Sequence, residues 1–158
     1  MNFFYRIKLH LHLFRYKFFK KSFYYSKNNE DLFLSNYFKN KLNGRYIDIG
    51  AHHPYRSSNT CLLYQAGWSG INIDLSKTSI DLFNIARPRD TNLNFVVADK
   101  KRKVKIYESK NLGLLNTINP MFASLFIKDN HTKKVYADSL NNLLKKYGDK
   151  NNKFDLID

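Results

Sequence analysis

The residues most suited to chemistry follow a short apolar stretch that ends in Asp-x-Gly-Ala. Asp48 precedes Gly50 and Ala51, and a second apolar stretch ends 26 positions later in another acid, Asp74. Small residues at the first site allow a ligand to approach the backbone closely. An acid at the end of the next strand can accept hydrogen bonds from both hydroxyls of a ribose. The pair predicts a strand–loop–helix–strand unit that holds a nucleoside cofactor.

The elements that must position these residues alternate between short strands and helices. Apolar, β-branched runs predict strands at Tyr46–Ile49, Ile71–Asp74, Asn94–Ala98, Val104–Tyr107 and Phe154–Asp158. Helical spacing predicts helices at Asn29–Lys39, Asn59–Gln65 (capped by Ser57 or Ser58), 77–86 (capped by Ser76) and Ser139–Tyr147 (capped by Asp138). The segment Asn111–Asn130 is expected to be irregular, with short strands near Leu114 and Phe126 as an alternative. This alternation indicates an α/β fold with a mostly parallel sheet.

Acids recur at the ends of the predicted strands. In an open parallel sheet a ligand binds beyond the carboxyl ends of the strands. Asp48, Asp74, Asp99 and Asp158 all fall at or near such ends, so together they predict a polar ligand site at one edge of the sheet. For Asp99 and Asp158 taken singly, a turn-forming or capping role is equally consistent with the sequence.

Two histidines lie in the loop where an acceptor would meet the cofactor. Histidine can take a proton near neutral pH, which makes His52 and His53 candidate bases. A role in shaping the pocket is favoured over catalysis for both. Asp158 is a third catalytic candidate, because it could orient an acceptor hydroxyl. These three residues lack the spacing of a metal-ligand set, so no metal site is expected.

Polar side chains follow in the same loop. Ser58 and Asn59, together with Thr60, can direct hydroxyl, amide or helix N-terminal groups toward a cofactor carboxylate. The same residues can simply cap the helix that follows. Both alternatives remain open from the sequence.

The residues around this core resemble a known family. Asp48-Ile-Gly-Ala-His-His-Pro-Tyr, Ser58-Asn-Thr and Gly67-Trp-Ser-Gly-Ile-Asn-Ile-Asp are similar to the FkbM family of S-adenosylmethionine-dependent methyltransferases. The likeness begins near Glu30 and extends to Asp158, about four-fifths of the chain. It implies a Rossmann-like class I methyltransferase fold with helices on both faces. It also implies S-adenosyl-L-methionine as cofactor and a sugar, polysaccharide precursor or secondary metabolite as the O-methylated acceptor.

The resemblance assigns roles to individual residues. Asp48, Gly50 and Ala51 correspond to the glycine motif that meets the methionine part of the cofactor. Asp74 corresponds to the acid that binds the ribose hydroxyls, and Asp99 to the position near the adenine.

The family domain continues past the Ile-Asp at which this sequence ends. We therefore expect an incomplete domain, with part of the acceptor pocket lying beyond Asp158. An unpaired fourth strand would offer a sheet edge for self-association. A non-catalytic protein that retains a methyltransferase-like half-domain is the alternative. A nicotinamide-dependent oxidoreductase is disfavoured, because the sequence has no Gly-x-Gly-x-x-Gly run.

Half of the positive charge lies in the N-terminal segment. The net charge is +14, and residues 1–28 hold seven Lys or Arg and no acid, interleaved with Phe and Tyr. We divide the chain into this basic aromatic segment and a methyltransferase domain over 29–158. The segment suits an anionic membrane surface, a helix packed on the domain, or a loose leader. Nucleic acid is not expected as a partner, because no recognition module follows.

The remaining composition favours a cytoplasmic protein. A single cysteine, Cys61, excludes an internal disulfide and fits a reducing compartment. No run of about 18 apolar residues is present, and Arg6, Lys8, Arg15 and Lys17 interrupt any secretory signal core. The expected location is the cytoplasm, with its inner membrane surface as an alternative.

Overall fold

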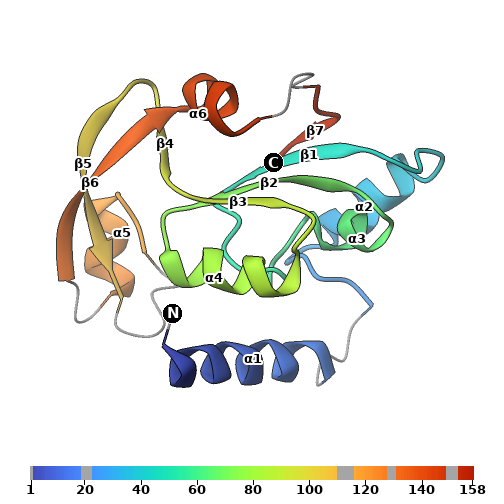
Figure 1. Cartoon of the computed structure of the whole chain (residues 1–158), viewed down its shortest axis with the longest axis horizontal. Coiled ribbons are helices and arrows are strands. Elements are labelled where there is room, and N and C mark those ends of the chain that lie inside the picture. The colour runs from blue at the N-terminus through green and yellow to red at the C-terminus, as the bar shows by residue number, and fades with distance from the viewer. Residues whose placement is uncertain (1, 19–22, 110–115, 128–130, 149–152) are drawn as a thin grey trace.

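The computed structural model describes residues 2–18, 23–109, 116–127, 131–148 and 153–158. Six helices and seven strands occur in these ranges (Figure 1). The helices are α1 Phe3–Phe18, α2 Glu30–Tyr37, α3 Cys61–Gln65, α4 Lys77–Ala86, α5 Pro120–Phe126 and α6 Leu140–Tyr147. The strands are β1 Arg45–Ile49, β2 Ser69–Asp74, β3 Thr91–Asn94, β4 Val96–Ala98, β5 Arg102–Glu108, β6 His131–Ser139 and β7 Leu156–Ile157.

A parallel sheet forms the centre of the structure. Among the described residues its strand order is β3-β2-β1-β7, with Ile47 of β1 opposite both Ile71 and Ile157. The chain first adds strands on one side of β1 and later on the other, so the order reverses between β1 and β7. Helix α4 lies on one face and α6 on the opposite face (Figure 1). The predicted α/β fold with a mostly parallel sheet is confirmed, and it is compatible with a Rossmann-like arrangement.

The two faces of this sheet bury different side chains. Ile47, Ile71 and Ile73 pack against Leu143 of α6. On the other face, Tyr46 packs with Trp68 and with Leu63 of α3. Successive strand residues point to opposite faces, so β1 supplies a buried side chain to each layer. The position of the carboxyl end of β1 is therefore fixed from both sides.

A second sheet lies beside the first and was not predicted. Its order is β4-β6-β5, with β4 parallel and β5 antiparallel to β6. The predicted strand Asn94–Ala98 is consequently wrong as one element. The core-sheet strand β3 ends at Asn94, and the chain passes through Phe95 before β4 joins the second sheet. The amide of Phe95 donates to the carbonyls of Asp74 and Leu93 at this break.

Two of the predicted helix caps are wrong, and one is confirmed. Ser76 caps α4 through a hydrogen bond from the Ser79 amide, as predicted. Helix α3 begins after Thr60, without a side-chain cap from Ser57 or Ser58. The cap of α6 is Ser139, which accepts from the Asn142 amide, and not Asp138.

The segment expected to be irregular contains α5. Asn119 caps this helix by accepting from the amides of Met121 and Phe122, and Pro120 occupies its first turn. Proline at the start of a helix costs nothing, because its missing donor would be unpaired there. The Asn-Pro pair was therefore an overlooked helix-start signal. Residues 111–115, which include the predicted strand near Leu114, and 128–130 lie outside the described residues.

The N-terminal segment begins with a helix that packs on the domain. Leu9 and Leu13 of α1 are buried against Leu82 of α4, with Tyr55 alongside. No helix in the described ranges is both long and apolar enough to cross a membrane.

Gly70 is a position where the sheet admits no side chain. A methyl group added there would overlap the ring and the carbonyl oxygen of Tyr46. We expect Gly70→Ala to lower the free energy of unfolding by about 1–3 kcal/mol, since overpacking forces neighbours to move. Urea unfolding followed by the fluorescence of Trp68, the single tryptophan, measures this. Gly148→Ala is the control, because its φ of −71° suits any residue. Equal stability of the two variants would contradict the packing described.

Candidate functional site

A cavity of about 290 Å³ opens at the carboxyl ends of β1 and β2. This volume is at the low end of ordinary ligand sites. The lining combines apolar side chains with a carboxyl, an imidazole and an amide. It consists of Ile49, Gly50, His52, Ile73, Asp74, Leu75, Phe95, Val96, Val97, Asn116 and Ile118.

Gly50 forms the turn between β1 and the loop that borders the cavity. Its φ is +79°, a left-handed conformation that glycine adopts without strain. Its amide donates to the carbonyl of Ile73 at 2.8 Å, and the Ala51 amide donates to the same oxygen at 3.2 Å. No atom lies within 4 Å of the point where a Cβ on Gly50 would sit. The backbone therefore faces open space, as a ligand-contacting glycine requires.

Asp74 ends β2 and carries the carboxyl group of the cavity. One oxygen accepts from the backbone amide of His52 at 2.9 Å, and the other from that of Ser76 at 2.6 Å. A carboxylate has about four acceptor sites, so each oxygen keeps capacity for a ligand hydroxyl. Burial raises the pKa of Asp74, and the two amides act in the opposite direction. The carboxyl is thus held rigidly at the cavity wall.

His52 is the predicted histidine that borders the cavity. Its backbone has a φ of +56°, which is uncommon for a residue with a side chain. The hydrogen bond from its amide to Asp74 compensates this conformation. Sequence reasoning placed His52 and His53 together, but the left-handed turn directs the two differently.

His53 is fully buried and is absent from the cavity lining. Its Nδ1 accepts from the amides of Tyr55 and Arg56 at 3.0 Å each. Its Nε2 lies 3.1 Å from Nε2 of His12 in α1. Because Nδ1 is an acceptor, His53 carries its proton on Nε2 and donates to His12. Burial lowers the pKa of His53 to about 3. The prediction of His53 as a catalytic base is therefore corrected to a structural role beneath α1.

Asp48 and Ala51 are also buried below the site and do not border the cavity. The Asp48 carboxylate accepts from the Thr60 hydroxyl at 2.7 Å. Burial raises the pKa of Asp48 to about 6. Asp48 thus fixes the start of α3, whereas the sequence placed its side chain against the cofactor. Ala51 contributes to this edge only through its backbone amide, which donates to the carbonyl of Ile73.

Arg87 is a fully buried guanidinium at the end of α4. It donates to the Thr60 hydroxyl and to the Ser58 hydroxyl, each at 2.8 Å, and to the carbonyl of Pro54. Ser58 is therefore occupied by Arg87, and the predicted contact of its side chain with a cofactor is corrected. The loop between β1 and α3 is tied to α4 at three points. No pattern in the sequence indicated this role of Arg87.

Asn59 and Asp158 form a second polar pair at the carboxyl edge of the sheet. The Asn59 amide donates to the Asp158 carboxylate at 3.1 Å. The backbone of Asp158 pairs with both Ile47 and Ile49 of β1. The two residues lie outside the cavity lining. The structure brings Asn59, from the loop before α3, next to Asp158, which follows β7 as the sequence predicted.

Asp99 lies away from this edge. It follows β4 in the second sheet, is 68% exposed and pairs with Arg102 at 3.3 Å. The predicted place near an adenine assumed that Asn94–Ala98 was one strand of the core sheet. Because the chain changes sheets at Phe95, Asp99 is carried out to the surface. That prediction is corrected.

Sequence reasoning missed the apolar wall of the cavity. Phe95, Val96 and Val97 come from the break between the two sheets, and Asn116 and Ile118 come from the segment expected to be irregular. No local pattern marks these residues as ligand contacts. They reach the site only because β4 and β5 fold back beside the core sheet. In the described part of the chain, no group of three or more His, Cys, Asp or Glu could hold a metal ion.

Comparison with known proteins leaves the resemblance in sequence as a prediction. The chain matches no protein-family model, no curated protein and no solved structure. The function is therefore inferred from the geometry of the site together with the resemblance in sequence.

The buried Asp48 makes stability depend on pH. Its pKa is about 6 when folded and 3.8 as a free carboxyl. Between these values the folded protein keeps a proton that the unfolded chain has lost, so stability falls as pH rises. The stability of the natural protein relative to Asp48→Asn should fall by ~2 kcal/mol from about pH 4 to about pH 6.

Urea unfolding of both proteins across this range measures the difference. Asp90 is also buried and Asp74 is half-buried, but both titrate in the two proteins, so the comparison removes most of their contribution. A difference that is independent of pH, or that grows with pH, would mean that Asp48 is ionised in the folded state.

Proposed function

We propose that this protein is an S-adenosylmethionine-dependent methyltransferase that methylates a hydroxyl of a sugar, polysaccharide precursor or secondary metabolite. The observation that carries the proposal is the pairing of Gly50 and Asp74 on one cavity at the carboxyl edge of a parallel sheet. Ligands of open α/β sheets bind beyond the carboxyl ends of the strands, and this cavity lies at the ends of β1 and β2, on the side of β1 opposite to β7. The resemblance to the FkbM family supports the same assignment and supplies the acceptor class.

The polar side of the cavity suits the ribose. The carboxyl of Asp74 is fixed by two amides and has acceptor capacity left. Vicinal hydroxyls are paired donors that such a carboxyl accepts well. The open backbone at Gly50 borders the same cavity.

The apolar side of the cavity suits a purine. Leu75, Phe95 and Val97 supply flat or branched apolar surface, and Asn116 supplies one amide that can donate and accept. A nucleobase needs this combination, because its faces are apolar and its edge carries hydrogen-bonding groups. The lining of the cavity therefore offers a polar group for the ribose and apolar groups for the base of an adenosine.

Other polar groups at the same edge of the sheet are available for the parts of the cofactor and acceptor that lie outside the cavity. Asn59 and Asp158 stand on the β7 side of β1 and can bind the amino-acid part of the cofactor or the acceptor. When bound, S-adenosylmethionine supplies a sulfonium methyl group. His52 borders the cavity and is the histidine that can take the proton from an acceptor hydroxyl.

Binding of S-adenosylhomocysteine tests the cofactor assignment. We expect one-to-one binding by calorimetry and at least a tenfold loss in Asp74→Ala, because the variant lacks the acceptor for the ribose hydroxyls. Asp99→Ala is the matched control, since Asp99 is exposed in the second sheet and should bind normally.

Thermal unfolding of both variants, followed at Trp68, checks that the folded state is retained. If folded Asp74→Ala binds S-adenosylhomocysteine as tightly as the natural protein, Asp74 does not bind the ribose hydroxyls. A folded natural chain that binds no S-adenosylhomocysteine would contradict the proposed function itself.

A further inference from the structure

Helix α1 has two apolar faces with different surroundings. The inner face packs on the domain through Leu9 and Leu13, which are buried against Leu82. Tyr5 and His12 on the same face reach Asp81 and His53 by hydrogen bonds. These contacts fix the rotation of α1 about its own axis. The opposite face is consequently held outward.

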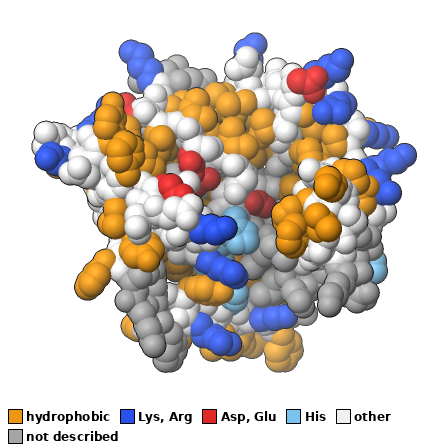
Figure 2. All heavy atoms as spheres, turned by 180° about the vertical axis from the view of Figure 1, so that it is seen from behind, with side chains coloured by type: hydrophobic (Ala, Val, Ile, Leu, Met, Phe, Trp, Pro, Cys, Tyr) orange, Lys and Arg blue, Asp and Glu red, His pale blue; other side chains and the backbone are white. Residues whose placement is uncertain are grey.

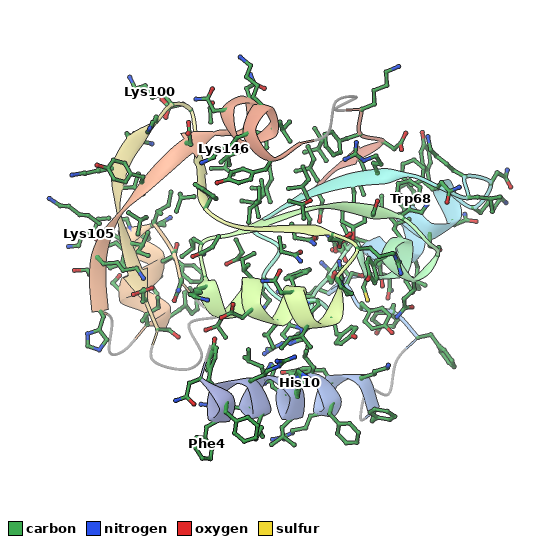
Figure 3. The ribbon with its side chains drawn as sticks, in the orientation of Figure 1. Phe4, His10, Trp68, Lys100, Lys105 and Lys146 are labelled. Carbon is green, nitrogen blue, oxygen red and sulfur yellow. The ribbon has the colours of Figure 1, made fainter. Side chains whose placement is uncertain are left out.

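The outer face is apolar and aromatic. With about 100° between successive helix residues, its six large side chains fall within roughly 100° of arc. Phe4 is 78% exposed and points away from α4 (Figure 3). The outer face consists of Phe3, Phe4, Ile7, Leu11, Phe14 and Phe18, all exposed. A continuous apolar surface of this kind is costly in water and marks an interaction site.

Cations border the outer face on both sides. Lys8 and Arg15 lie along one margin, and Arg6 and Lys17 along the other, and all four are exposed. The helix contains no acid. Figure 2 shows hydrophobic and basic side chains side by side along the lower edge of the molecule, where α1 lies. The pattern is an apolar stripe between two rows of positive charge.

We propose that α1 binds an anionic membrane surface, lying flat with its outer face in the acyl boundary and its cations against the headgroups. Interfacial helices have this distribution of apolar and basic residues, and each basic residue near an anionic surface adds to the affinity. A second copy of this chain fits less well, because two such helices face to face would bring their cations together. The surface is independent of the cofactor site and of the methyltransferase proposal.

Co-sedimentation of the full chain with lipid vesicles tests the proposal. We expect the natural protein to bind vesicles of equimolar phosphatidylserine and phosphatidylcholine, and to bind pure phosphatidylcholine much more weakly. The double variant Phe4→Ser, Leu11→Ser should lose at least about tenfold in the partition constant, since it removes two inserted side chains. The double variant Lys8→Gln, Arg15→Gln should lose roughly tenfold on the anionic vesicles alone.

A matched control is available on α5. Leu125 and Phe126 are 66% and 60% exposed, so Leu125→Ser, Phe126→Ser removes a similar apolar surface elsewhere. This variant should bind within about twofold of the natural protein. The proposal would be overturned by no binding of the natural protein to anionic vesicles, or by equal losses in the α1 and α5 variants. A dimer in light scattering that Phe4→Ser, Leu11→Ser dissociates would also overturn it, in favour of a second copy.

Discussion

The buried guanidinium of Arg87 is the constraint on which the arrangement of the site depends. It is fully buried and holds the hydroxyls of Ser58 and Thr60 and the carbonyl of Pro54. A buried cation is stable only where hydrogen bonds and opposite charge replace water. The hydroxyl of Thr60 in turn donates a hydrogen bond to the carboxylate of Asp48. The loop between β1 and α3 therefore has one conformation, set by α4 from below the sheet.

This network separates the polar residues near the sheet edge into two groups. Residues that face Arg87 or α1, such as Asp48 and His53, are satisfied inside the protein. Residues that the loop turns outward, such as His52 and Asp74, border the cavity. The buried residues orient those that border the cavity, because they hold the left-handed turns at Gly50 and His52 in place from below. The proposed cofactor site depends on this division.

Local signals in the sequence were enough to place β1, β2 and the capped helix α4, because strand runs and the Ser76 cap depend on neighbouring residues. The proposal of a ligand site at the sheet edge followed from the same elements. The contacts of individual side chains did not follow from local signals, because their partners are distant in the sequence. His53 is fixed by His12, 41 residues away, and no pattern near either reveals this contact. The break at Phe95 was hidden as well, since one apolar run supplies strands to two sheets.

The most direct test of this account is a titration of the ¹⁵N-labelled chain with S-adenosylhomocysteine, followed by amide chemical shifts. The account predicts saturable shifts at the cavity lining, above all at Gly50, His52 and Val97, with little change in α1 or at Asp99. Shifts confined to other surfaces, or a well-folded spectrum that does not change, would contradict the cofactor site at the carboxyl edge of β1 and β2.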